Sequence, residues 1–240
     1  MTKKTSEYIV AYIDMLGTKS RMKNSEKNQL FLNTLYKRFN NIKKQVKDPS
    51  SKIDLKFFSD NLVIAKKLVS SQKPQERVSN IRNVLSLASY FQYDSAVCDN
   101  GFLVRGAVTI GDFFVEKGSI VYGHALDRVY KLERDIAIYP RIIIDPKELP
   151  EFKNNETIRS YISNDFDGIY FLNYLKNMKN QKTPSDNEFE KIKKMGYYDK
   201  KDLHDETGVY ADKVYQKCSW HTNYVNREQG NSNTNNKPSS

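Results

Sequence analysis

The sequence predicts an α+β protein built on a sheet with helices on one face. Short runs of aromatic and β-branched residues alternate with longer segments in which apolar residues recur at helical spacing. These segments follow in the order strand, helix, strand, strand, helix, strand, and a further strand–helix–strand portion comes after them. Hydrophobic residues make up 38% of the 240-residue chain, which is enough for a sizeable core. The order of segments corresponds to the ferredoxin-like plan.

The first two elements are a strand at residues 8–13 and a helix at 18–46. Aromatic and β-branched composition predicts the strand. The apolar residues that recur at helical spacing in the second segment are Leu30, Phe31, Leu35, Phe39 and Ile42. The run Asp-Pro-Ser-Ser at 48–51 ends this pattern, because proline and small polar residues favour a turn.

A hairpin and a second helix come next. Residues 53–58 and 61–66 are expected to be the two strands of the hairpin, with the polar run Ser-Asp-Asn at 59–61 as its bend. The apolar residues of 75–94 recur at helical spacing and predict the helix.

The remaining elements of the sheet follow an Asn-Gly turn. A long apolar strand is expected at 102–110 and a second short strand within 115–123. A short helix at 124–133 and a strand at 141–144 complete the predicted core.

The character of the chain changes after this core. Residues 7–146 are expected to form one domain, and 147–227 a mostly helical extension that packs on the core or builds a dimer contact. Within the extension, 168–172 resembles a strand and 205–224 a helix. The last residues, 228–240, are low in apolar side chains and are expected to be disordered.

Composition and charge exclude several classes of protein. No window approaches the roughly 18 apolar residues that a membrane helix requires, and the N-terminus lacks a signal-peptide core. Cys98 and Cys218 lack metal-ligand spacing, so a reducing cytoplasm is expected. The net charge of +10 leaves two interpretations open, general attraction of anions by solvated lysines or a surface for nucleic acid, and the scattered lysines favour the first.

Two aspartates indicate the chemistry. Asp14 and Asp60 each follow a run that predicts a buried strand. Two carboxylates brought together at one edge of a sheet suit a hard divalent cation, and the Leu-Gly-Thr that follows Asp14 offers backbone amides for phosphate. A nucleoside triphosphate site is therefore predicted. The alternatives are that Asp14 caps the following helix or forms a buried ion pair, and that Asp60 is an ordinary turn residue.

Four motifs occur in order and at compatible spacing: YIDMLGTKS, KFFSDNLVIA, LVRGAVTIGD and YGHALDRVYKLE. Together they resemble the class III nucleotidyl cyclases. The details FSDNLVIA, RGAVTIGD and YPRIIID are most similar to the pyrimidine cyclases of the bacterial anti-phage system called Pycsar. The resemblance covers residues 8–145.

The resemblance implies an enzyme that converts UTP or CTP to the 3′,5′-cyclic monophosphate and diphosphate, with cUMP preferred over cCMP as the product. The product would be a second messenger in abortive infection, read by a separate effector protein. Two Mn²⁺ or Mg²⁺ ions per site would be held by Asp14, Asp60 and the carbonyl of Met15. The family also implies a head-to-tail homodimer with its active sites at the interface. The composition predicts no membrane partner, and the scattered lysines do not favour a nucleic acid partner.

The resemblance assigns further roles by position. The loop that would hold the triphosphate consists of Met15, Leu16, Gly17 and Thr18. Lys56 occupies the position of the base-reading residue in purine-specific relatives, although a solvated strand lysine is the alternative. Phe58 lies on the same strand face as Lys56. It could narrow the base pocket to favour a pyrimidine, or simply pack in the core.

Two residues depart from the family pattern, and a third has two possible roles. Asp127 lies where the ribose-binding Asn is usual, and Lys131 lies where the transition-state Arg is usual. Arg105, inside an apolar strand, needs an anionic partner, either a structural carboxylate or a substrate phosphate. The alternative functions are a purine cyclase and a non-catalytic domain of the same fold that binds nucleotide or nucleic acid.

Overall fold

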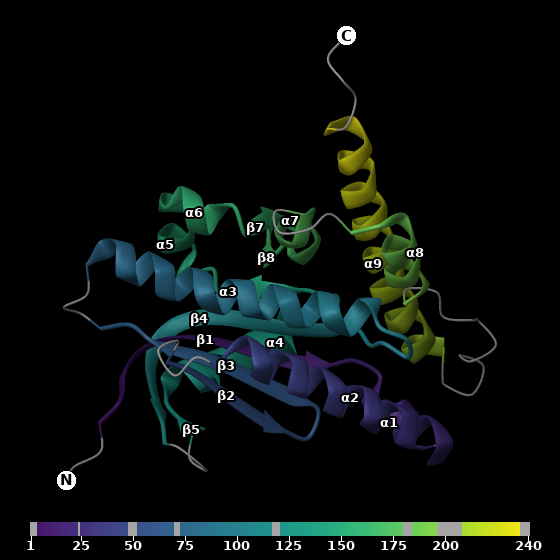
Figure 1. Ribbon diagram of the computed structural model, residues 1–240, viewed down its shortest axis with the longest axis horizontal. Helices are drawn as coiled ribbons and strands as arrows, with labels where there is room; N and C mark the ends of the chain where they lie inside the picture. The colour runs from purple at the N-terminus through teal and green to yellow at the C-terminus, as the bar shows by residue number, and fades with distance from the viewer. Residues whose placement is uncertain are drawn as a thin grey trace.

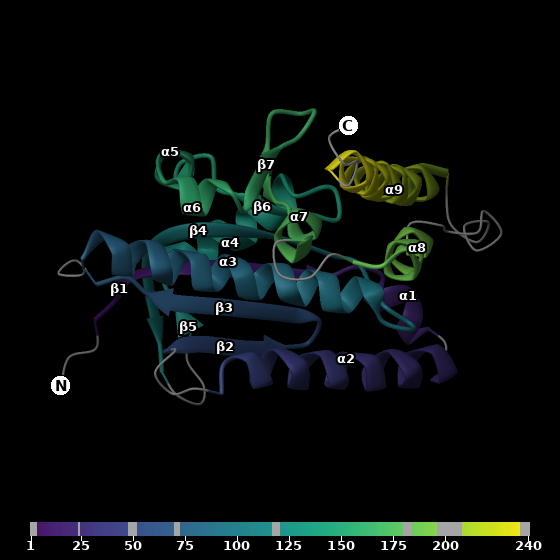
Figure 2. The ribbon, with the colours of Figure 1, turned by 45° about the horizontal axis from the view of Figure 1, so that its top comes forward.

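The computed structural model describes most of the chain as one continuous arrangement of sheet and helices (Figures 1 and 2). The described residues are 4–23, 25–47, 52–69, 73–116, 121–179, 184–195 and 208–235. All structural statements below concern these ranges.

Eight strands form a single mixed sheet. Their bounds are β1 Ser6–Met15, β2 Ile53–Phe58, β3 Asn61–Lys67, β4 Val104–Val115, β5 Val121–Tyr122, β6 Ile142–Ile144, β7 Ile162–Asn164 and β8 Tyr170–Leu172. The strand order is β2-β3-β1-β4-β6-β8-β7, with β5 paired to β4. Strands β4 and β6 pair in parallel, and the other pairs are antiparallel. The predicted α+β class and the hairpin at 53–66 are confirmed.

The helices match the prediction in the core and add to it in the extension. Their bounds are α1 Thr18–Met22, α2 Ser25–Gln45, α3 Pro74–Val97, α4 His124–Asp135, α5 Leu149–Asn154, α6 Glu156–Arg159, α7 Tyr174–Lys179, α8 Asp186–Lys194 and α9 Gly208–Asn235. The predicted first helix is divided into α1 and α2. Three predicted elements lie wholly or partly outside the described ranges. They are the turn at 48–51, the middle of the short strand within 115–123 (117–120) and the start of the helix at 205–224 (205–207).

Alternation along β1 divides the core between the two faces of the sheet. Ile9, Ala11 and Ile13 pack in one apolar cluster with residues of α2 and α3, and Figure 1 shows these two helices in front of the sheet. Val10 and Tyr12 belong to a second cluster that includes the inner face of α4. Helices therefore cover both faces, rather than the one face expected. The reason is that α4 has an apolar stripe of its own to bury.

The extension belongs to the same sheet. Strands β8 and β7 continue it beyond β6, and α7 packs on α3, where Asn177 Nδ2 donates a hydrogen bond to Ser89 Oγ at 2.9 Å. The long helix α9 lies beside α8 with its C-terminal end pointing away from the sheet (Figure 1). No described helix is both long and apolar enough to cross a membrane.

The prediction that residues 228–240 are disordered is wrong for 228–235, which are helical. Helix α9 continues to Asn235, and Glu228 is buried, where its carboxylate accepts a hydrogen bond from Asn173 Nδ2 at 3.0 Å. Composition missed this because a few buried contacts hold a segment that is otherwise polar. Residues 236–240 lie outside the described ranges.

A buried ion cluster joins the extension to the core. Arg141, just before β6, is 1% exposed and donates to the carboxylates of Asp165 and Asp167 in the turn between β7 and β8. The indole Nε1 of Trp220 in α9 donates to Asp165 Oδ2 at 2.7 Å. One arginine thus ties together segments from three parts of the chain.

Stability is expected to fall as the pH decreases below 6.5, because His221 is buried in α9. Burial lowers its pKa from 6.5 to about 3, and its Nε2 lies 3.3 Å from the Tyr174 hydroxyl. The unfolded chain takes up a proton below pH 6.5 while the folded protein does not. Stability is therefore complete above pH 6.5 and is lost between pH 6.5 and about 3.

The measurement is urea unfolding of the wild type and of His221→Gln, which cannot take the charge, at several pH values between 7 and 5. The free-energy difference between wild type and variant should fall by about 1.4 kcal/mol for each pH unit below 6.5. A constant difference would show that His221 is not kept neutral by the fold. Carboxyl groups titrate equally in both proteins, so they cancel.

Candidate functional site

The end of β1 and the β2–β3 turn bring the two predicted aspartates together. The register of β1 places Asp14 opposite Asn61 of β3 and opposite Arg105 of β4. The amide of Met15 donates to the carbonyl of Asp60 at 3.0 Å, which ties the turn directly to the end of β1. The strand pairing therefore places Asp14 and Asp60 at the same edge of the sheet.

A tyrosine and an asparagine orient the turn that carries Asp60. The Tyr12 hydroxyl donates to Asn61 Oδ1 at 2.5 Å, and Asn61 Nδ2 donates to Asp60 Oδ1 at 3.3 Å. Tyr12 also contacts Tyr130 of α4 edge to face, with ring centroids 5.9 Å apart. The carboxylate in the turn is thereby linked to the helix on this face of the sheet.

Arg105 lies between two carboxylates. Its Nε is 3.3 Å from Asp14 Oδ2 and 2.5 Å from Glu133 Oε1 of α4. Burial raises the pKa of Asp14, the Arg105 guanidinium opposes this rise, and the Asp60 carboxylate adds to it. The guanidinium therefore has the structural carboxylate partners that were one of its two predicted roles.

The glycine after Arg105 is required by the same strand pairing. A Cβ at Gly106 would lie 2.1 Å from the backbone oxygen of Tyr12, a distance that no side chain tolerates. Strand β4 can lie this close to β1 only without a side chain at this position. The Arg-Gly pair thus combines a charged group for the site with the close approach that places it there.

Two charged residues of the site were missed in the sequence. Glu133 is buried, and burial raises its pKa to about 7 despite the nearby Arg105. The sequence could have predicted the burial of Glu133, because this residue falls on the apolar stripe of α4 beside Leu132 and Val129. Lys217 of α9 interacts electrostatically with Asp14, Glu133 and Arg105, and burial lowers its pKa. No local pattern predicts Lys217, since only the tertiary fold brings α9 here.

The loop after Asp14 offers fewer backbone amides to a phosphate than the sequence suggested. The amides of Met15 and Leu16 donate to Asp60 O and Leu103 O, so these two are engaged within the fold. Gly17 has a φ of 81°, a left-handed conformation that favours glycine. The Thr18 hydroxyl donates to the carbonyl of Met15 at 2.9 Å. The predicted four-amide cradle is corrected to a tight turn whose first two amides are already used.

The donor set fits a divalent cation shared with a polyphosphate. Within the described residues, no group of three or more His, Cys, Asp or Glu side chains is arranged to hold a metal ion. Two carboxylates and the carbonyl of Met15 would therefore be the protein's contribution. Mg²⁺ commonly binds through one or two carboxylates, with waters and substrate phosphates as its other ligands.

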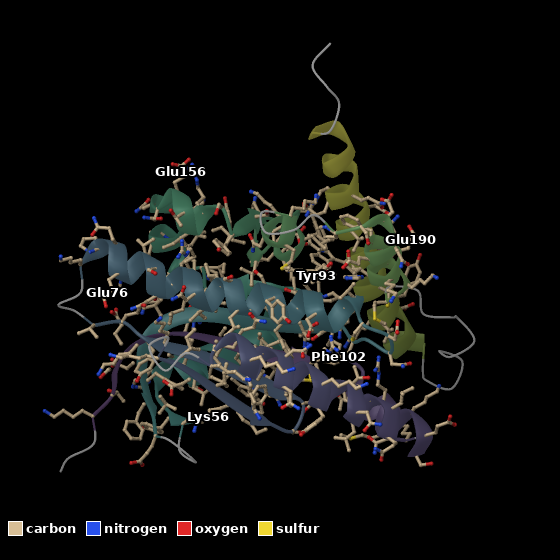
Figure 3. The ribbon with its side chains drawn as sticks, in the orientation of Figure 1. Lys56, Glu76, Tyr93, Phe102, Glu156 and Glu190 are labelled. Atoms are coloured by element: carbon tan, nitrogen blue, oxygen red, sulfur yellow. The ribbon has the colours of Figure 1, made fainter. Side chains whose placement is uncertain are left out.

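The predicted base-reading residues lie on the sheet face opposite α2. Lys56 extends from β2 (Figure 3), and its Nζ donates to the Glu116 carbonyl at 2.9 Å. Phe58 is 44% exposed, whereas Phe57 packs on Phe39 of α2 with ring centroids 4.0 Å apart. The predicted alternation of the two phenylalanines is confirmed, and Phe58 is not a core residue.

Asp127 and Lys131 lie on the outer side of α4. Lys131 Nζ donates to Asp127 Oδ2 at 2.7 Å, and both side chains are more than half exposed. In the described part of the chain, no hydrogen bond or ion pair joins either residue to Asp14 or Asp60. The single chain therefore does not bring all the predicted site residues together.

Solved structures with the same arrangement of strands and helices identify the fold. One is the guanylate cyclase domain of RhGC from Catenaria anguillulae in complex with GTP, with a TM-score of 0.50 and 12% identity over 71% of this chain and 98% of that chain. The chain has the fold of a guanylyl cyclase domain. A second is the catalytic core of a rhodopsin-guanylyl cyclase with converted specificity in complex with ATPalphaS, with a TM-score of 0.50 and 14% identity over 72% and 98% of the two chains. No protein-family model and no curated protein sequence matches this chain.

Proposed function

We propose that this protein is a class III nucleotidyl cyclase. Residues 7–146 would be its catalytic unit, which converts a ribonucleoside triphosphate to the 3′,5′-cyclic monophosphate and diphosphate. The observation that carries the proposal is the junction of Asp14, Asp60 and Arg105 at one edge of a sheet with a cyclase fold. Of the alternatives for Asp14, no side-chain hydrogen bond caps α1, whereas the ion pair with Arg105 is present. That ion pair and the position of Asp60 in the β2–β3 turn are compatible with metal binding, because each carboxylate has a second oxygen to offer.

In the reaction, the ribose 3′-oxygen forms a bond to the α-phosphorus while the bond from that phosphorus to the departing diphosphate breaks. Asp14, Asp60 and the Met15 carbonyl would hold two Mn²⁺ or Mg²⁺ ions, which when bound neutralise phosphate charge and acidify the 3′-hydroxyl. Arg105 offers a fork of donors to phosphate oxygens, and Glu133 holds it in place at 2.5 Å. Positioning and charge stabilisation would provide most of the rate enhancement.

A second copy of the chain would complete each site. Lys56, Phe58, Asp127 and Lys131 would serve the site of the partner in a head-to-tail homodimer. The exposure of Phe58, and of Tyr130 beside Asp127 and Lys131, supports this because large apolar side chains commonly lie in interfaces. Lys131 would meet phosphate as a point charge, without the bidentate geometry of arginine.

For the substrate we propose a pyrimidine triphosphate, UTP before CTP, with the cyclic product read by a separate effector in anti-phage defence. An exposed Phe58 beside Lys56 would narrow the base pocket. A purine cyclase is the second candidate. Lys56 favours it, and so do the fold neighbours bound to GTP and ATPalphaS. A non-catalytic domain that binds nucleotide or nucleic acid is the third, and the net charge of +10 favours it.

The test is incubation of the purified protein with ATP, GTP, CTP or UTP and Mn²⁺, followed by chromatography of the products and assay of diphosphate. Conversion of UTP or CTP, lost on addition of EDTA, is the expected result. Conversion of ATP or GTP alone would establish the purine cyclase instead. Absence of both cyclic product and diphosphate with all four nucleotides would contradict a cyclase, and salt-sensitive binding of RNA would then support the third candidate.

A further inference from the structure

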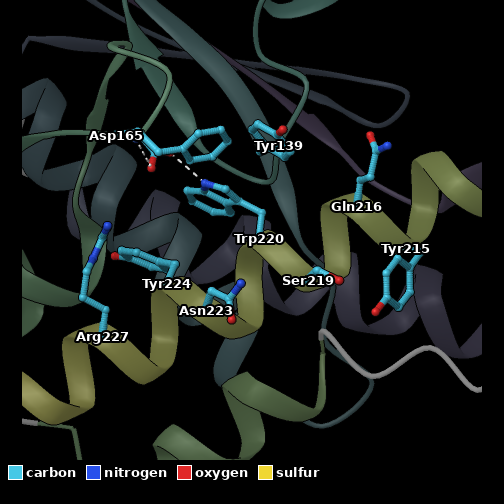
Figure 4. A pocket seen from close by; sticks show the side chains of 10 residues that line it. Tyr139, Asp165, Tyr215, Gln216, Ser219, Trp220, Asn223, Tyr224 and Arg227 are labelled. Carbon is cyan, nitrogen blue, oxygen red and sulfur yellow. Dashed lines mark hydrogen bonds between the residues drawn. The ribbon is translucent and has the colours of Figure 1, made fainter.

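Helix α9 and the β7–β8 turn line a partly open cavity of about 410 Å³ (Figure 4), which shares no lining residue with the Asp14 site. Its lining comes from the turn, from the segment before β6 and from one face of α9. The lining residues that carry the argument are Tyr139, Phe166, Gln216, Trp220, Asn223 and Arg227. A cavity of this size falls within the range of small-ligand sites.

One wall is a rigid stack of aromatic rings. Trp220 lies between Tyr139, with centroids 5.9 Å apart and planes at 14°, and Tyr224, with centroids 5.3 Å apart and planes at 9°. The hydrogen bond from its indole to Asp165 fixes the ring further (Figure 4). A wall that is held this firmly is preorganised for a ligand.

A second aromatic group at the cavity is exposed. Phe166, in the turn, is 74% exposed although its ring lies 5.6 Å from that of Tyr139. A phenylalanine this exposed beside a cavity leaves an apolar face that a planar ring could cover by stacking. The carboxamides of Gln216 and Asn223 on α9 add both donors and acceptors near this face.

One cationic side chain, that of Arg227, lines the cavity. Arg227 lies over the Tyr224 ring, with Cζ 5.8 Å from the centroid, and its side chain is about half exposed. Its carboxylate partner among the described residues is Glu228, at 3.8 Å, which already accepts a hydrogen bond from Asn173. Asp165, the acidic lining residue, is bound by Arg141 and Trp220. An anionic group is therefore the natural partner for Arg227.

We propose that this cavity is a second, non-catalytic site that binds a mononucleotide. The base stacks on Phe166, the carboxamides of Asn223 and Gln216 bind its polar edge, and the phosphate pairs with Arg227. A planar ring joined to a single phosphate matches the aromatic, carboxamide and cationic groups that the cavity presents. The inference does not rest on cyclase activity, because none of these residues belongs to the Asp14 site.

The sequence contains a single tryptophan, Trp220, so its fluorescence reports on this cavity. The experiment is a titration of the full-length protein with UMP, AMP or their 3′,5′-cyclic forms in EDTA, by tryptophan emission and by calorimetry. A saturable change is expected with the linear or the cyclic form, and the tighter of the two identifies the natural class. Uridine, which lacks phosphate, and ribose 5-phosphate, which lacks a base, should bind roughly tenfold or more weakly.

Two variants at exposed positions test the contacts. Arg227→Gln and Phe166→Ala should each weaken binding by roughly tenfold or more. The matched controls, Arg82→Gln on α3 and Tyr36→Ala on α2, are exposed and remote, and should bind as the wild type does. The proposal is overturned if calorimetry detects no binding, if nucleosides bind as tightly as nucleotides, or if both cavity variants bind normally. Cyclase turnover of these variants is expected to be unchanged, which separates this inference from the proposed function.

Discussion

Asp14→Asn is expected to lower cyclase turnover by roughly 10³-fold or more, since the charge stabilisation lost with a metal carboxylate amounts to several kcal/mol at about 1.4 kcal/mol per tenfold. Asn keeps the shape of the side chain, and Glu133 still holds Arg105 at 2.5 Å. The fold should therefore survive while the reaction does not. Turnover is measured with the preferred triphosphate and Mn²⁺, and the folded state by circular dichroism and thermal unfolding.

Asp60→Asn should behave in the same way, because its turn is joined to the same strand end by the Met15 amide. The matched control is Asp112→Asn, an exposed carboxylate on β4. Its turnover should stay close to that of the wild type. If either Asp14→Asn or Asp60→Asn kept a tenth of wild-type turnover, the pair would not be the metal site.

Arg141→Leu is expected to lower the free energy of unfolding by about 3–5 kcal/mol, which is the cost of removing one partner of a buried ion pair. Arg141 is 1% exposed and holds the nearly buried Asp165, which would be left as an uncompensated charge. Because Asp165 also accepts from Trp220, α9 should loosen with the β7–β8 turn. Urea unfolding near neutral pH gives the magnitude, and near-ultraviolet dichroism of Trp220 reports on α9.

The control is Arg134→Leu, whose exposed pair with Asp135 is screened by solvent, so its loss should leave the free energy of unfolding nearly unchanged. Adding Asp165→Asn to Arg141→Leu removes the unpaired charge and should restore part of the stability. A loss below about 1 kcal/mol for Arg141→Leu would mean that the cluster does not join the extension to the core.

The elements predicted from sequence were those with a strong local signal. The aromatic and β-branched run at 8–13 lies within β1, and the Ser-Asp-Asn bend separates β2 from β3. The strand predicted within 168–172 is confirmed as β8, whereas the three-residue strand β7 was not predicted, since three residues do not establish a period. Their position in the sheet depends on pairing with β6, which is a contact distant in sequence.

The candidate site divides in the same way. Asp14, Asp60 and Arg105 were recognisable because charges at or within apolar strands are costly without a partner. The position of Glu133 on the buried face of α4 could be predicted from the sequence, but its ion-pair partner, Arg105, could not. The engaged amides of Met15 and Leu16 could not be foreseen, since their acceptors come from other elements.

The order of residues alone established an α+β core, the hairpin and the pair of acidic groups at strand ends, because strand alternation and turn chemistry act over a few neighbouring positions. The three-dimensional arrangement established that α4 covers the second face of the sheet, that Arg105 lies between Asp14 and Glu133, and that Lys217 approaches them. These facts depend on which surfaces pack together, and packing joins residues that are distant in the chain.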